Sequence, residues 1–197
     1  MLPESFYRRK NVLAIARGLL GKTLVTKING QVTAGWVVET EAYSWRERGC
    51  HAYGNRRTAR NEVMFGPGGH AYVYLCYGIH HLFNVVTNEE ERAEAILVRA
   101  LEPVEGAEVM MKRLNAVRTA RLTSGPGKLT RALGISRQHN GISLQGEEIW
   151  LDDGIKVSPR MIVASPRIGI DYAGADMHLP WRFTIRGNHW VSVPPGR

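Results

Sequence analysis

The chain has 197 residues, 44% of them hydrophobic, which fits one domain over residues 1–197 with a sizeable core. No apolar run approaches the roughly 20 residues of a membrane helix, and no hydrophobic region or cleavage site follows the basic N-terminus. We therefore expect no membrane span and no signal peptide, and a cytoplasmic, nucleoid or nuclear location.

The formal net charge of +8 is unevenly distributed. Residues 89–108 hold seven acidic side chains and two arginines, whereas residues 112–137 hold seven basic side chains and no acidic one. The seven are Lys112, Arg113, Arg118, Arg121, Lys128, Arg131 and Arg137. Such segregation is typical of proteins that bind polyanions. An ordinary solvated face of a basic protein is the alternative.

The first predicted element is a helix over Ser5–Leu20, capped by Ser5 and ended by Gly21. Its apolar face comprises Val12, Ile15, Ala16, Leu19 and Leu20. Two strands follow, over 22–28 and 31–41, and Asn29-Gly30 between them is a strong hairpin signal.

Residues 44–69 lack apolar periodicity and predict a long loop with a short helix. The rest of the chain predicts a second hairpin turning at Gly78-Ile79, between strands 70–77 and 80–87, and a strand over 95–100. Helices are expected over 105–114 and 127–133, and strand-like runs over 161–164, 182–186 and 190–193. Because no regular alternation of strands and helices appears, we predict an α+β domain. It would have a mainly antiparallel curved sheet, flanking helices and a protruding β-hairpin.

Several familiar motifs fail. The segment from Ser124 to Leu129 lacks the first glycine and the final Ser or Thr of a phosphate-binding loop, so we predict a turn that opens a helix. The free N–H groups of that helix could hold a DNA phosphate. Cys50-His51 and His80-His81 lack metal-ligand spacing, so we expect no metal and no other cofactor. Cys50 and Cys76 are expected to be free thiols.

The run Val37–Tyr43 leads an apolar strand into two carboxylates. Alternate side chains of a strand share a face, so Glu39, Glu41 and Tyr43 should point the same way. A carboxylate beside an aromatic ring at a strand end is a reasonable general base. A solvated strand edge with an exposed glutamate pair is the alternative.

The run Ala71–Ile79 places Tyr72 and Tyr74 on one face and Tyr77 at the turn. Strand tyrosines normally pack. A tyrosine at a hairpin tip of a basic protein is better suited to insertion into a base stack.

Seven strings resemble successive motifs of the alkyladenine (3-methyladenine) DNA glycosylase family. They are VVETEAY, CHAYGNRRTARNEVMFGPGGHAYVYLCYG, NVVT, ILVRALEP, SGPGKLTRALGI, RIGIDYAG and PWRFTIRG. They occur in family order and cover nearly the whole chain, from about Leu13 to Val193. The resemblance implies flipping and hydrolytic excision of damaged purines from double-stranded DNA, the first step of base excision repair.

Position by position, the resemblance implies that Glu41 activates the attacking water, held also by Arg99 and the main-chain carbonyl of Ile168. It implies a base pocket of Tyr43, His51, Tyr74 and Asn84, where Asn84 would clash with a guanine amino group. Tyr77 would fill the gap left by the flipped nucleotide, with Ile79 as its apolar neighbour.

The resemblance further implies duplex DNA as the partner, and a monomer suits the task. Phosphate contacts are expected from Arg56, Arg57, Arg60 and Lys128. The motif positions hold no lysine suited to a Schiff base, which favours excision without strand cleavage. Where many family members have an acidic residue after Tyr172-Ala173-Gly174, this chain has Ala175 and then Asp176. A binding module without catalysis and an enzyme acting on free nucleosides are the competing hypotheses.

Overall fold

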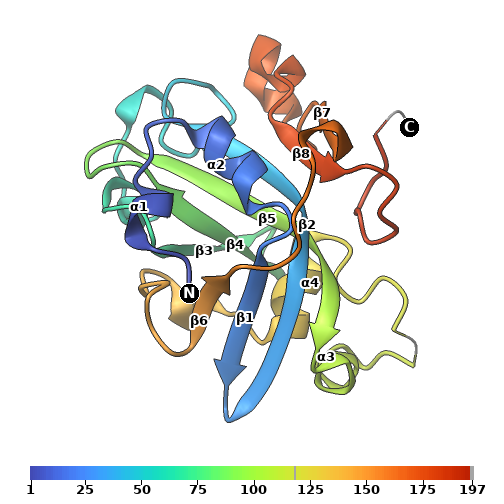
Figure 1. Cartoon of the computed structure of the whole chain (residues 1–197). Helices are drawn as coiled ribbons and strands as arrows, with labels where there is room; N and C mark the ends of the chain where they lie inside the picture. Colours follow the sequence, from blue (N-terminus) through green and yellow to red (C-terminus); the bar gives the residue numbers. More distant parts are fainter. Residues whose placement is uncertain (118, 196–197) are drawn as a thin grey trace.

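The computed structural model describes residues 1–117 and 119–195. Strands in this part of the chain form one antiparallel sheet in the order β3-β4-β5-β2-β1-β6, with β8 pairing to both β2 and β7 (Figure 1). They are β1 (Thr23–Ile28), β2 (Gln31–Ser44), β3 (Ala71–Cys76), β4 (His80–Thr87), β5 (Glu94–Glu105), β6 (Ile149–Asp152), β7 (Ile162–Ser165) and β8 (Arg182–Ile185). The predicted α+β class is confirmed.

Strand β2 is the organising strand of the sheet. It pairs with β5 along one edge, and along the other edge first with β1 and then, at Glu39–Glu41, with β8. Its register against β5 shifts on either side of Glu39, and such bulges bend a strand and redirect its side chains. The β1–β2 turn is the predicted one, with positive φ of 53° at Asn29 and 73° at Gly30.

The predicted helix over Ser5–Leu20 is wrong, because the chain forms α1 (Glu4–Tyr7) and then α2 (Val12–Leu19). Asn11 separates them: its backbone is extended, and its side chain accepts a hydrogen bond from the amide of Ala14 at 3.0 Å. An asparagine that can bond its own backbone favours such a cap over a helix interior. The predicted end is confirmed by Gly21, whose φ is 81°.

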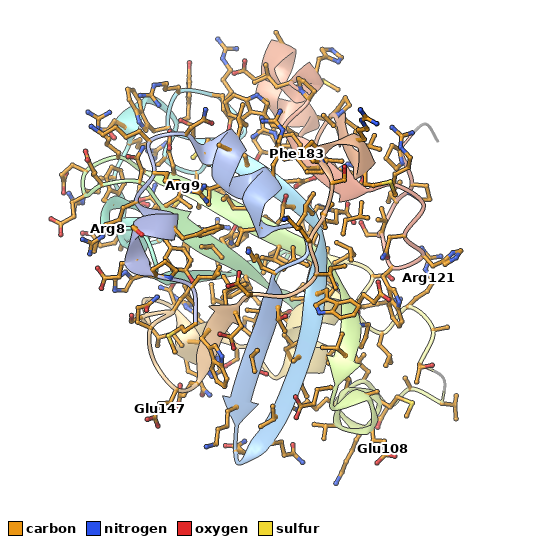
Figure 2. The ribbon with its side chains drawn as sticks, in the orientation of Figure 1. Arg8, Arg9, Glu108, Arg121, Glu147 and Phe183 are labelled. Carbon is orange, nitrogen blue, oxygen red and sulfur yellow. The ribbon has the colours of Figure 1, made fainter. Side chains whose placement is uncertain are left out.

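Helix α2 lies across β2 and β5 and buries its apolar face there (Figure 1). Helix α3 (Ala107–Leu114) packs against α4 (Pro126–Leu133), which contacts β4 and β5. Phe183 is fully buried in the core, whereas Arg8, Glu108, Arg121 and Glu147 project from the periphery (Figure 2).

The predicted loop after β2 carries the short 3₁₀ turns η1 (Tyr53–Asn55) and η2 (Glu62–Phe65). Further turns of this kind are η3 (Arg137–His139), η4 (Pro159–Met161) and η5 (Asp171–His178). No helix in the described residues is both long enough and apolar enough to cross a membrane.

The strand-like run over 190–193 is not a strand. Its backbone bonds to side chains instead: the amide of Ser192 donates to Glu39, and the carbonyls of Ser192 and Val193 accept from Arg121 and Arg182. These side-chain contacts replace the ladder that a further strand would make.

Candidate active site

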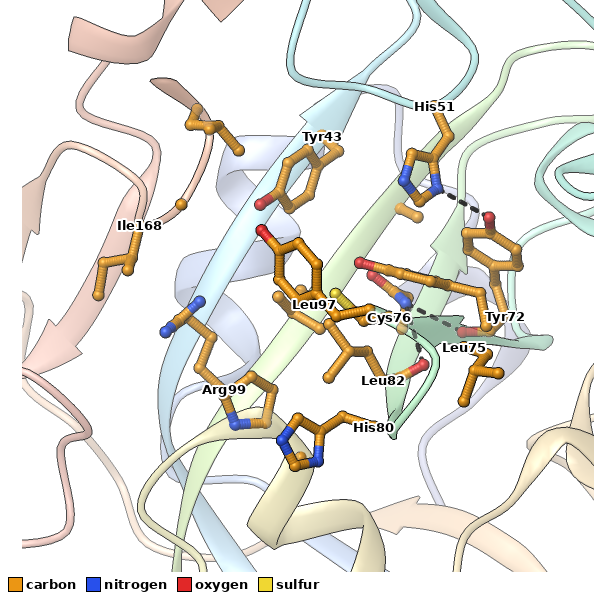
Figure 3. Close-up of a pocket in the computed structure, with 18 of the residues that line it drawn as sticks. Tyr43, His51, Tyr72, Leu75, Cys76, His80, Leu82, Leu97, Arg99 and Ile168 are labelled. Carbon is orange, nitrogen blue, oxygen red and sulfur yellow. Dashed lines mark hydrogen bonds between the residues drawn. The ribbon is translucent and has the colours of Figure 1, made fainter. Parts of the chain in front are cut away.

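A cavity of about 980 Å³ opens on the sheet face opposite α2. The other face of the sheet packs against α2. Thr40, which lies between Glu39 and Glu41, points to that face, and its hydroxyl donates to the Ala16 carbonyl in α2 at 3.0 Å. Nine of the predicted site residues line the cavity together, although they come from distant segments. Tyr43, His51, Arg99 and Ile168 are labelled in Figure 3, and the others are Arg60, Tyr74, Tyr77, Asn84 and Lys128.

Glu41 is fully buried behind that lining. Its Oε2 accepts hydrogen bonds from the Tyr43 hydroxyl at 2.8 Å and Arg99 Nη1 at 3.3 Å, and its Oε1 accepts one from the Ile168 amide at 2.8 Å. Burial, and then the nearby Glu41 carboxylate, hold the pKa of Tyr43 well above its usual value, so that hydroxyl keeps its proton. The carboxylate is thus fixed by three cavity residues.

Glu39 is also fully buried, so a solvated strand edge with an exposed glutamate pair is wrong. Its Oε1 accepts from Arg99 Nε at 3.1 Å and from Arg182 Nη1 at 3.0 Å, and its Oε2 accepts from the Ser192 amide at 2.7 Å. Arg99 therefore bridges the two carboxylates, as their shared strand face predicts. Buried charges of this kind persist only when they are paired and hydrogen-bonded.

An aromatic wall stands beside this network. The Tyr72 and Tyr74 rings lie 5.4 Å apart, and the His51 ring meets Tyr74 edge-on at 4.6 Å. His51 Nδ1 is bound to the Tyr72 hydroxyl at 2.9 Å (Figure 3), which leaves Nε2 for other partners. Burial, and then the positive charge of Arg60, lower the pKa of His51 to about 4. The imidazole is accordingly neutral at physiological pH.

Asn84 is held rigidly at the cavity floor. Its Nδ2 donates to the Tyr72 carbonyl at 3.0 Å, and the residue is buried. The side chain therefore cannot swing aside readily when a ligand enters.

The β3–β4 hairpin turns at Tyr77-Gly78, with φ of 50° and 73°. Tyr77 is 86% exposed and Ile79 is 73% exposed, so both side chains project from the tip beside the cavity. Two large exposed apolar side chains at one tip are a feature of contact surfaces rather than of a core.

The predicted phosphate-binding residues differ in their surroundings. Arg56 is exposed, and the exposed Lys128 lies at the cavity mouth in the first turn of α4. Arg57, however, is paired with Glu62 and Glu91, and Arg60 lies over the Tyr74 ring at 5.3 Å.

The basic segment 112–137 is only partly available for a polyanion. Arg113 donates to the Ala132 carbonyl and is half-buried, which gives it a structural contact. Arg131 donates to the Arg113 carbonyl while remaining exposed. Arg118 lies outside the described residues.

Sequence reasoning assigned no site role to Glu39, Tyr72 or Arg182. For Glu39 and Tyr72 the strand period supplied a signal, since each lies two residues from a predicted site residue on the same face. For Arg182 there was none, because it meets Glu39 only through the pairing of β8 with β2. A buried pair, Arg167 and Glu47, was also missed, and its two residues are 120 positions apart.

Asp176 has a definite contact despite its shifted position, because its Oδ2 accepts from the Arg48 amide at 2.9 Å. Both cysteines are free, as predicted. Burial raises the pKa of the Cys50 thiol to about 12, so it stays protonated.

Comparison with known proteins shows the family of this chain. Residues 5–189 match the family described as methylpurine-DNA glycosylase (MPG). A relative from Carboxydothermus hydrogenoformans, named "Putative 3-methyladenine DNA glycosylase", is 48% identical over 98% of each chain. Proteins of the same name from Clostridium acetobutylicum and Chlamydia felis are 44% and 45% identical, over 98% and 94% of this chain and 97% and 96% of their own lengths. The chain belongs to the methylpurine-DNA glycosylase family.

Proposed function

We propose that the protein hydrolyses the N-glycosidic bond of alkylated or deaminated purines in double-stranded DNA. The observation that carries this proposal is Glu41, a buried carboxylate fixed by three donors at the wall of an aromatic cavity. The substrate class comprises 3-methyladenine, 7-methylguanine, hypoxanthine and ethenoadenine. The reaction is the first step of base excision repair.

The cavity suits both charged and neutral purines. A methylated purine nucleotide carries positive charge, and the faces of Tyr43 and Tyr74 can attract it by about 0.5–2 kcal/mol each. A neutral base such as hypoxanthine gains less from the rings and needs a hydrogen bond, which neutral His51 can supply through Nε2. Asn84, fixed by its hydrogen bond to the Tyr72 carbonyl, would press against the amino group of an ordinary guanine, which lacks the positive charge that draws 7-methylguanine toward the rings.

In the chemical step, a water molecule held by Glu41, Arg99 and the Ile168 carbonyl attacks C1′ of the sugar. The bond from water oxygen to C1′ forms while the bond from C1′ to the base breaks, and the base leaves with the electron pair. Glu41 accepts the proton of the water and stabilises the cationic sugar. A general base of this kind contributes about 10²–10⁴-fold in rate.

DNA is held around the cavity. Tyr77 fills the gap left by the flipped nucleotide, which offsets part of the unstacking cost of a few kcal/mol. Lys128 and Arg56 supply phosphate contacts that do not read sequence. We also propose that the enzyme acts as a monomer and leaves an abasic site without cutting the strand.

The test is single-turnover excision from a labelled duplex that carries one hypoxanthine, followed by hot alkali. Wild type should give cleavage only after alkali, and Glu41→Gln should lose at least about 10²-fold in rate while it still binds damaged duplex. Glu147→Gln, the same change on an exposed side chain, should behave as wild type. A Glu41→Gln variant that excises at the wild-type rate would remove Glu41 from this role.

A further inference from the structure

A separate buried ion pair, between Arg167 and Glu47, lies behind the cavity lining. Arg167 Nη1 and Nη2 donate to the two oxygens of Glu47 at 2.7 and 2.6 Å, and both side chains are almost completely excluded from solvent. This two-pronged geometry is the strongest form of an arginine–carboxylate contact. Neither residue takes part in the proposed chemistry.

The pair fastens three segments of the site. Arg167 also donates to the Ala42 carbonyl at 2.9 Å, and Glu47 accepts from the Gly49 amide at 2.7 Å. Arg167 immediately precedes Ile168, whose amide binds Glu41. The end of β2, the turn after it and the segment at 167–168 are thereby held around the buried carboxylate.

Arg167 also has an electrostatic position. Its guanidinium lies over the Tyr43 ring at 4.7 Å, yet it is not part of the cavity lining. It therefore contacts Tyr43 from the side away from the cavity. A cation behind an aromatic ring weakens the attraction of its other face for a second cation.

Glu47 neutralises that cation. Three glutamates (39, 41 and 47) and three arginines (99, 167 and 182) are buried at or behind the cavity lining and joined by ion pairs, while the buried Glu94 pairs separately with Arg46. Without Glu47 the set of these three arginines and the two remaining glutamates would carry a net charge of +1. That charge would lie next to the slot, the part of the cavity beside Tyr43 and Tyr74 that receives the proposed cationic substrates.

We propose that Glu47 determines the charge selectivity of the site: by neutralising Arg167 behind Tyr43, it allows a cationic methylated purine to enter the slot. This inference rests on the proposed function and names which member of the substrate class depends on the pair. Neutral purines bring no net charge into the slot, so they should depend on Glu47 much less.

The experiment compares two substrates under subsaturating single-turnover conditions: methylated duplex, from which released 3-methyladenine is counted, and a hypoxanthine duplex. Glu47→Gln should lower the ratio of the two rates, methylated over hypoxanthine, by about tenfold or more, as expected for two unit charges about 8 Å apart in a protein. The loss should appear as a weaker apparent affinity for methylated duplex.

Two further variants separate charge from packing. Arg167→Gln leaves the set with a net charge of −1, and the double variant E47Q/R167Q restores neutrality. The ratio should not fall in Arg167→Gln, and it should return toward the wild-type value in the double variant. If Glu47→Gln does not fold, the comparison of R167Q with E47Q/R167Q still measures the removal of Glu47, and the ratio should be lower in the double variant.

A purely structural pair gives a different pattern, in which every variant slows both substrates in parallel. An unchanged ratio in Glu47→Gln, or a fall of equal size in Glu47→Gln and Arg167→Gln, would overturn the inference. Failure of the proposed function is a separate result, since wild type would then release neither base.

Discussion

The buried carboxylate of Glu39 offers a sharp test of the network behind the cavity. Glu39→Gln keeps the shape of the side chain but removes the charge that Arg99, Arg182 and the Ser192 amide all bind. Removing one partner of a buried ion pair costs about 3–5 kcal/mol, because an uncompensated charge stays buried. For a chain of this size about 1 kcal/mol lowers the melting temperature by roughly 2–4 °C, so we expect a fall of about 10 °C.

The same substitution should also slow catalysis. The glutamine amide oxygen can still accept from Arg99 Nε, but without the carboxylate charge it holds the guanidinium less firmly, and Arg99 would keep its 3.3 Å contact with Glu41. Small displacements in a catalytic constellation cost up to about 100-fold in rate, and we expect at least about tenfold here.

Circular dichroism measures the melting temperature, and single-turnover excision at a temperature where both proteins are folded measures the rate. Glu147→Gln controls for the loss of one carboxylate at an exposed position and should melt close to wild type, because surface changes stay within about 0.5 kcal/mol. If Glu39→Gln has the same melting temperature as Glu147→Gln, the buried network contributes little to stability and the reasoning is refuted.

Three further predictions concern the pocket and the DNA surface. Tyr77→Ser should weaken capture of the flipped nucleotide more than it slows the chemical step. Fluorescence of a base analogue in the duplex measures flipping, and single-turnover excision measures the chemical step. Unchanged fluorescence in the variant would contradict the proposal that Tyr77 fills the gap left by the flipped nucleotide. The folded-state pKa of His51 is lowered from 6.5 to about 4, so its neutral form contributes roughly 3 kcal/mol of stability above pH 6.5 that is lost as pH falls toward 4. Denaturant unfolding should show this pH dependence in wild type and not in His51→Gln; equal slopes would rule it out. Lys128→Ala should reduce the slope of log affinity against log salt by about 1 if it binds a phosphate, and an unchanged slope would exclude that contact.

Local sequence was a reliable guide where a single physical signal acts over a few residues. Asn29-Gly30 and Gly78 fixed two hairpins, because few other residues adopt positive φ at low cost. The two-residue period of a strand correctly put Glu39 and Glu41 on one face. The same kind of reasoning failed at Asn11, where a side-chain cap overrode a continuous apolar pattern.

The roles implied by the family motifs identified residues that do meet, since seven of them, Tyr77 included, line one cavity. They did not indicate how each residue is engaged. Arg57 is bound to two glutamates, and Arg60 lies over a tyrosine ring, while their contacts with phosphate stay predictions. Exposed arginines look alike in a sequence, and only their neighbours in space decide which remain available.

Composition, hairpin signals and strand periodicity thus determined the α+β class, the hairpin with Tyr77 at its tip and the shared face of the two glutamates. Tertiary structure alone decided that Glu39 and Glu41 are buried, that Arg182 reaches Glu39 across 143 positions, and that Arg167 and Glu47 pair behind Tyr43. The physical reason is that conformational preferences act over a few neighbouring residues. The burial and pairing of a charge depend on which distant segments the sheet brings together.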